Sequence, residues 1–160
     1  MNTEGTEVDL ILWRHAEAFD PMDGEHDLQR RLTPRGEKHA TRIAQWLEQQ
    51  LPEGTRILCS PALRAEQTVK ALGRKYKVRD ALAPGAMVQD LLETAGWPNA
   101  KYPVLLVGHQ PTLGAVVSDL FGMGPEPTAI RKGAVWWLRC RQREGARQTV
   151  ILSVMTPERL

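Results

Sequence analysis

Cysteine is scarce in this chain: 2 of the 160 residues are cysteines, Cys59 and Cys140. Two cysteines make neither a disulfide framework nor a zinc site, and both lie in apolar segments, so we expect buried free thiols. Long apolar runs are also missing, which excludes a membrane-spanning helix of roughly 20 residues. Residues 1–7 are polar and lack the charged-then-apolar order of a signal peptide, so we expect a cytoplasmic protein.

An excess of charge of one sign is missing as well. The 21 lysines and arginines against 19 acidic residues give a formal net charge of +2, too near balance to indicate a nucleic-acid partner. No internal repeat or low-complexity linker divides the sequence. We therefore expect one domain, residues 1–160, that buries roughly 70% of its unfolded surface. We expect it to be monomeric and to bind neither nucleic acid nor membrane.

The most informative feature that is present is an Arg14-His15 pair directly after the apolar run at residues 8–13. A run of β-formers ending in this pair predicts a buried strand with both side chains at its carboxyl end, where open α/β sheets place their ligands. Histidine can be a neutral nucleophile near pH 7, and arginine matches a phosphate with two parallel charge-assisted hydrogen bonds. The pair is the minimum set of groups for moving a phosphoryl group through a phosphohistidine.

A second segment adds another arginine to this set. Residues 55–59 predict a strand, Ser60 a helix N-cap and Pro61 the first helical position. Arg64 then falls in the first turn of the helix, beside backbone N–H groups that already favour an anion. The segment therefore predicts a second anion-binding side chain at a strand end.

A third segment repeats the arrangement with a histidine. Residues 103–107 predict an apolar strand, which ends in Gly108-His109 before Pro111 opens the next helix. Three strand ends of one sheet can meet at the same edge. The candidate catalytic residues expected to converge there are Arg14, His15, Arg64 and His109.

These motifs resemble those of the histidine phosphatase superfamily, also called phosphoglycerate-mutase-like, and within it the short SixA-type phosphohistidine phosphatases. The resemblance runs from about Leu10 to the C-terminal strand. It includes the family's stretch between the first strand and the first helix, here Asp27-x-x-x-Arg31-Leu32-Thr33-x-x-Gly36. The family motif is usually Arg-His-Gly, whereas Ala16 follows the pair here, from which we expect a slightly altered pocket floor.

Strand-like and helix-like segments alternate along the chain. Expected strands cover residues 8–13, 55–59, 77–82, 103–107, 134–141 and 149–155, and expected helices cover 34–50, 61–74, 86–95 and 111–121. Thr33 and Pro34 mark the start of the first helix, and Glu144-Gly145 marks a hairpin. The alternation predicts an α/β fold with three α/β/α layers, a mainly parallel central sheet and a C-terminal antiparallel hairpin. The resemblance implies the same phosphoglycerate-mutase-like fold.

The expected loop at residues 16–33 is long and must pass the mouth of the site. Long loops either have a function or are mobile surface segments. Both alternatives stay open here: a loop that gates substrate access, and a mobile surface loop without a role in the reaction. Two histidines lack motif support. We expect a solvated side chain for His26 in this loop, and a surface or partly buried position for His39 in the first helix.

Each candidate residue has an expected role. His15 is the expected nucleophile, and its attacking nitrogen must be unprotonated, so the other ring nitrogen should donate to a backbone carbonyl. Arg14 and Arg64 should clamp the phosphoryl oxygens and stabilise charge in an in-line transfer. The family resemblance assigns His109 as a protonated donor to the transferring phosphoryl group.

A general acid is missing from its usual place. Larger members of the superfamily carry a Glu or Asp after the helix with the second arginine, but residues 82–87 contain no carboxylate. Such an acid protonates an alkoxide leaving group, whereas the P–N bond of phosphohistidine is labile and imidazole leaves more easily. Glu17 is the nearest substitute by sequence and a candidate substrate-binding residue. Asp90 and Glu93 fit a solvated helix face.

We therefore expect a metal- and cofactor-free phosphatase that transfers phosphate to His15 and then hydrolyses the adduct. Its expected partner is a phosphorylated substrate, such as a phosphohistidine-carrying signalling or phosphotransfer protein. Two alternatives stay open: a small-molecule phosphomonoesterase of the same superfamily, and a phosphate-binding module with vestigial turnover. The two histidines argue against the module, because binding alone would need only the arginines.

Overall fold

The computed structural model describes residues 7–160, apart from the side chain of Arg143. The expectation about a signal peptide at the start of the chain falls largely on residues 1–6, which lie outside the described residues. Within residues 7–160, no helix is long and apolar enough to cross a membrane. Cys59 and Cys140 are buried free thiols, as predicted.

A six-stranded sheet forms the centre of the structure, in the order β3-β2-β4-β1-β5-β6. Its strands are β1 (Glu7–Arg14), β2 (Arg56–Cys59), β3 (Lys77–Val78), β4 (Val104–Gly108), β5 (Val135–Arg143) and β6 (Ala146–Met155). The strands β1, β4, β2 and β3 run parallel, whereas β5 is antiparallel to β1 and β6 is antiparallel to β5. The predicted mainly parallel sheet with a C-terminal hairpin is confirmed.

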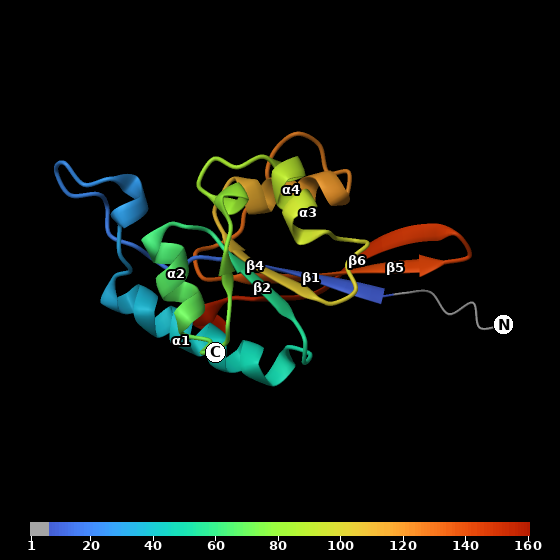
Figure 1. Ribbon diagram of the computed structural model, residues 1–160, viewed down its shortest axis with the longest axis horizontal. Helices are drawn as coiled ribbons and strands as arrows, with labels where there is room; N and C mark the ends of the chain where they lie inside the picture. Colours follow the sequence, from blue (N-terminus) through green and yellow to red (C-terminus); the bar gives the residue numbers. More distant parts are fainter. Residues whose placement is uncertain (1–6) are drawn as a thin grey trace.

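Helices cover both faces of this sheet (Figure 1). They are α1 (Pro34–Gln50), α2 (Leu63–Lys70), α3 (Val88–Ala95) and α4 (Thr112–Leu120), with short 3-10 turns η1 (Asp27–Gln29), η2 (Asp80–Leu82) and η3 (Pro157–Arg159). One core cluster joins the sheet to α1 and α2, and another joins it to α3 and α4. The three-layer α/β/α architecture is confirmed.

Strand β1 shows why an unbroken apolar run marks this fold. Leu10 and Leu12 pack in the α3–α4 core, while Ile11 and Trp13 pack in the α1–α2 core. All four are fully buried, because a central strand with helices on both faces has no solvated side. The apolar run ends at Arg14, the last residue of β1, and His15 follows it.

The start of α1 follows its sequence signals. The Thr33 hydroxyl accepts the Gly36 N–H at 2.9 Å, and Pro34 occupies the first turn. A side chain at Gly36 would overlap the Glu17 carbonyl oxygen, so the glycine lets the loop after β1 lie against the helix. The loop itself is partly ordered by η1 and by a bridge between Ala18 and Leu32.

Several predicted boundaries of α2 and β3 are wrong. Helix α2 begins at Leu63 rather than 61, because the Ser60 hydroxyl binds the Ala62 N–H and closes a turn before the helix. The same helix ends at Lys70 rather than 74, before Gly73 with its positive φ of 70°. The predicted strand at 77–82 is divided, since only Lys77 and Val78 pair with β2 and residues 80–82 form η2.

Candidate active site

The carboxyl ends of three parallel strands bring the sequence motifs together. Arg14 at the end of β1 is the register partner of Gly108 at the end of β4, and the His15 N–H donates to the Gly108 carbonyl at 3.2 Å. The rings of His15 and His109 have centroids 5.1 Å apart. Arg64, from the first turn of α2, lies near enough to both rings to affect their titration. The four predicted residues therefore share one site.

His15 is buried, and one of its ring nitrogens is fixed by the backbone. Nδ1 lies 2.7 Å from the Ala16 carbonyl oxygen, which can only accept, so Nδ1 carries the proton and Nε2 is free. Burial, with help from the positive charges around it, lowers the pKa of His15 to about 3. The ring is therefore neutral near pH 7 and has the tautomer that the sequence argument requires of a nucleophile.

Two arginines supply positive charge beside this ring. Arg14 donates to the Ile130 carbonyl at 2.8 Å, while Arg64 donates to the Asp27 carbonyl at 2.8 Å and to its carboxylate at 3.1 Å. Burial, and then the charge of Arg64, lower the pKa of Arg14. Within the described residues, the buried Nε–H groups of Arg14 and Arg64 have no hydrogen-bond partner. Buried unpaired donors are unfavourable, so both guanidinium groups suit an anion.

His109 is held by Ser60, a contact that the sequence reasoning missed. Its Nε2 lies 2.7 Å from the Ser60 hydroxyl, which accepts the Ala62 N–H at 3.1 Å. The hydroxyl can therefore donate to neutral His109 or accept from its protonated form. Both side chains are buried. The position of Ser60 directly after a strand end is a signal for this contact, whereas its predicted role as N-cap of α2 is wrong, because the N-cap is Ala62.

His109 is neutral in the free protein, whereas its predicted protonation applies to the site with a phosphoryl group bound. Burial, and then the charge of Arg64, lower the pKa of His109 to about 4, so the ring is neutral near pH 7. The cause is its desolvated position beside two arginines. The negative charge of a bound phosphoryl group would favour the protonated form.

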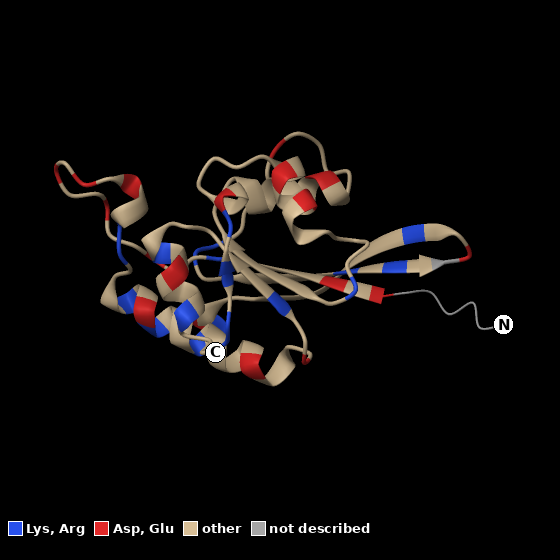
Figure 2. Cartoon of the chain, viewed as in Figure 1, with Lys and Arg blue, Asp and Glu red and all other residues tan. Residues whose placement is uncertain are grey.

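Asp27 belongs to the family stretch, but its contact with Arg64 is a second one that the sequence reasoning missed. Its carboxylate binds Arg64, and it also binds Arg30 at 3.3 Å. Desolvation opposes ionisation, but these two arginines outweigh it and hold the pKa of Asp27 below its usual range. The family stretch contains both Asp27 and Arg31, and the guanidinium of Arg31 lies over the Phe19 ring, 4.7 Å from its centroid. Figure 2 shows the loop that carries η1 as rich in acidic residues.

Glu17 and Ala16 follow the histidine. The Glu17 carboxylate accepts the Thr33 hydroxyl at 2.8 Å and is thereby tied to the N-cap of α1. Ala16 is fully buried, and its N–H donates to the Thr68 hydroxyl at 3.0 Å. Among the described residues, the only positive φ outside glycine is at Glu144, so alanine fits at position 16 without backbone strain.

The other singled-out side chains lie outside this constellation. His26 is exposed, as predicted, with Nδ1 accepting the Leu28 N–H. His39 is more buried than predicted, because it lies on the inner side of α1. Asp90 and Glu93 are exposed on α3, as predicted. Within residues 7–160, no group of three or more His, Cys, Asp or Glu side chains is arranged to hold a metal ion.

A buried neutral histidine beside two arginines, at the carboxyl ends of parallel strands, suits a site that handles phosphoryl groups. The family model described as histidine phosphatase superfamily (branch 1) matches residues 10–85. An uncharacterised protein of Picosynechococcus sp. is 35% identical over 142 residues, covering 82% of this chain and 85% of that protein. This chain belongs to the histidine phosphatase superfamily and is a phosphatase.

Two comparisons point to one group within the superfamily. Phosphohistidine phosphatase SixA of Escherichia coli (strain K12) is 30% identical over 126 residues, covering 71% of this chain and 74% of that protein. The solved structure of the protein histidine phosphatase SixA complexed with tungstate has a TM-score of 0.77 and 26% identity, and the match covers 95% of this chain and 99% of that chain.

Proposed function

We propose that this phosphatase removes the phosphoryl group from phosphohistidine on a protein, through a covalent intermediate on His15. The observation that carries the proposal is the 2.7 Å contact from His15 Nδ1 to the Ala16 carbonyl, which leaves Nε2 as a free nucleophile in a buried, neutral ring. The likeness to SixA proteins, named for phosphohistidine and histidine phosphatase activity, supports the substrate class.

The reaction consists of two phosphoryl transfers, first to His15 and then to water. His15 Nε2 attacks the phosphorus, the P–N bond breaks, and the substrate ring, protonated on its other nitrogen, departs as neutral imidazole. Water then attacks the phosphorus on His15, which releases inorganic phosphate and restores the free histidine. Arg14 and Arg64 stabilise the charge on the phosphoryl oxygens in both steps. His109 takes up a proton when the anion binds and donates a hydrogen bond to it.

The leaving group decides the substrate class. Residues 82–87 carry no carboxylate, and the Glu17 carboxylate is held by Thr33 at the start of α1. The carboxylate beside the site, Asp27, is ionised by its arginine partners and so is a poor proton donor near pH 7. An alkoxide would therefore depart without general acid catalysis, whereas imidazole does not depart as a strong base.

A substrate panel tests this proposal. The ratio of kcat/KM for a phosphohistidine protein, or for phosphoramidate, over that for a sugar phosphate should be about 10²–10⁴, the usual contribution of general acid catalysis. Glu17→Gln should change the ratio only modestly. Comparable kcat/KM values on both substrates, or a loss in Glu17→Gln confined to the sugar phosphate, would make Glu17 a general acid and the protein a metabolite phosphatase.

A further inference from the structure

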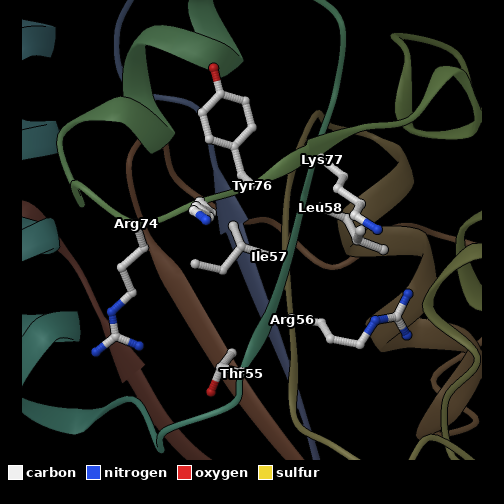
Figure 3. A pocket seen from close by; sticks show the side chains of 8 residues that line it. Thr55, Arg56, Ile57, Leu58, Arg74, Tyr76 and Lys77 are labelled. Atoms are coloured by element: carbon white, nitrogen blue, oxygen red, sulfur yellow. The ribbon is translucent and has the colours of Figure 1, made fainter.

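A cavity of about 550 Å³ lies at the β3 edge of the sheet, and its lining residues (Figure 3) do not include the candidate catalytic residues. It is lined by residues 55–58, which include the first part of β2, and by residues 74–77, which lead into β3. We call this cavity the edge groove. Neither side of it contributes to the constellation around His15.

The floor of the edge groove includes the start of β2, where the strand edge is unpaired over two residues. Strand β3 pairs with β2 only through Leu58 and Cys59. Arg56 and Ile57 pair with β4 on their other side, and within the described residues they have no strand partner on the groove side. An unpaired strand edge presents main-chain donors and acceptors to an extended peptide, which can add as a further strand.

The walls of the edge groove are positively charged. Arg56, Lys75 and Lys77 are exposed, and within the described residues they have no carboxylate partner. A fourth cation, Arg74, is already paired with Glu48 at 3.1 Å. Figure 3 shows Arg56 and Lys77 extending on one side of β2 and Arg74 on the other, and Figure 2 shows cationic positions on both β2 and β3. An occupant with negative charge would complement them.

We propose that the edge groove docks an acidic, extended segment of the phosphorylated protein substrate, which adds alongside β2. The open strand edge favours a polypeptide over other polyanions, because only a polypeptide completes the main-chain pairing. The location also suits a substrate. At about 3.3 Å per residue, Leu58 in the groove lies only about 7 Å along the strand from Ser60 in the catalytic site. This inference rests on the proposed protein substrate.

The first test compares two charge-reversal variants. The groove variant is Arg56→Glu with Lys77→Glu, and the control is Lys38→Glu with Arg42→Glu on the exposed face of α1. Each replaces one lysine and one arginine and changes the formal net charge from +2 by −4 to −2. The groove variant should raise KM for the phosphohistidine protein about tenfold and leave kcat/KM for phosphoramidate within about twofold, since exposed charge pairs act on association rather than chemistry. The control should leave both unchanged.

The second test measures docking without turnover. Binding of an eight-residue peptide that alternates Glu and Val is measured on the wild-type chain, beside the same peptide with Gln for Glu and a single-stranded oligothymidine. The acidic peptide should bind more tightly than the Gln peptide, and the groove variant should weaken it about tenfold. Equal binding of the two peptides, equal weakening by both double variants, or equally tight groove-dependent binding of the oligothymidine would overturn the inference.

The two tests also separate this inference from the proposed function. If the phosphohistidine protein is not a substrate but the acidic peptide binds at the groove, the proposed function fails and the groove remains a peptide site. If the protein is turned over and its KM is the same in the groove and control variants, the docking inference fails while the proposed function stands.

Discussion

Two arginine–carboxylate pairs in this protein have the same separation but different surroundings. At the candidate active site, Arg64 lies 3.1 Å from Asp27, and beside the edge groove Arg74 lies 3.1 Å from Glu48. The two carboxylate side chains are 50% and 54% exposed, so they are nearly equal in their contact with water. The guanidinium sides differ, because Arg64 is 5% exposed and Arg74 is 27% exposed.

The difference shows what burial does to a charge. At the candidate active site, burial and the nearby arginines together hold the pKa of His15 at about 3 and that of His109 at about 4. Beside the groove, water and salt screen the charges, and an exposed pair of this kind is worth about 0–1 kcal/mol. The buried cations can therefore set protonation states and stabilise a transition state, whereas the exposed cations attract a partner.

Among the substitutions, the loss of His15 is expected to have the largest effect on turnover. His15→Ala should lower kcat on phosphoramidate by at least about 10⁴-fold, because the covalent route loses its nucleophile. Acid-labile phosphate should be trappable on the wild-type chain and absent from the variant. Inorganic phosphate should still bind weakly to the variant, since Arg14 and Arg64 remain. The exposed loop variant His26→Ala is the control and should keep wild-type turnover. Substantial activity in His15→Ala would exclude a covalent route through this residue.

The strand ends and their motifs could be predicted from the sequence because each depends on local signals. Buried strands give unbroken apolar runs, and Gly108, Pro34 and Thr33 mark where elements begin or end. The contacts of Asp27 with Arg64 and of Ser60 with His109 could not be predicted in this way. They join residues 37 and 49 positions apart, and no local signal in the sequence pairs them. The pKa of His109 was unpredictable for a related reason, since it depends on burial that only the assembled site creates.

The low pKa of His109 predicts that anion affinity at the buried site depends on pH. Its pKa of about 4 in the free protein should rise above 7 when an anion lies between the arginines, so anion binding takes up a proton. Sulfate is a dianion throughout the neutral range, and its affinity should fall about tenfold per pH unit from pH 5 to 7. Calorimetry in buffers of different ionisation enthalpy measures both the affinity and the proton uptake.

The variant His109→Gln assigns this proton. It should bind sulfate with an affinity that is nearly independent of pH, because the titrating group is gone while the arginines remain. A sulfate affinity that is already flat from pH 5 to 7 in the wild-type chain would contradict proton uptake. An unchanged slope in His109→Gln would assign the proton to another group.

The smallest expected effect compares the two carboxylates directly. Asp27→Asn should lower kcat about tenfold, because Arg64 loses the charged partner that orients its guanidinium, and about 1.4 kcal/mol suits a partly exposed charged hydrogen bond. Phosphate should bind no more weakly than to the wild-type chain, since a negative charge next to the anion is removed. Steady-state kinetics on phosphoramidate and phosphate inhibition together measure this split.

Glu48→Gln is the matched variant at the other pair. It removes one carboxylate charge at the same 3.1 Å separation, but its arginine is more exposed. Its kcat and phosphate affinity should equal those of the wild-type chain, and its free energy of unfolding should change by less than about 1 kcal/mol. If the two variants lost the same activity, guanidinium burial would not distinguish the pairs. If Asp27→Asn weakened phosphate binding without lowering kcat, Asp27 would hold Arg64 for binding alone, and the charge that orients the transition state would have to come from Arg14.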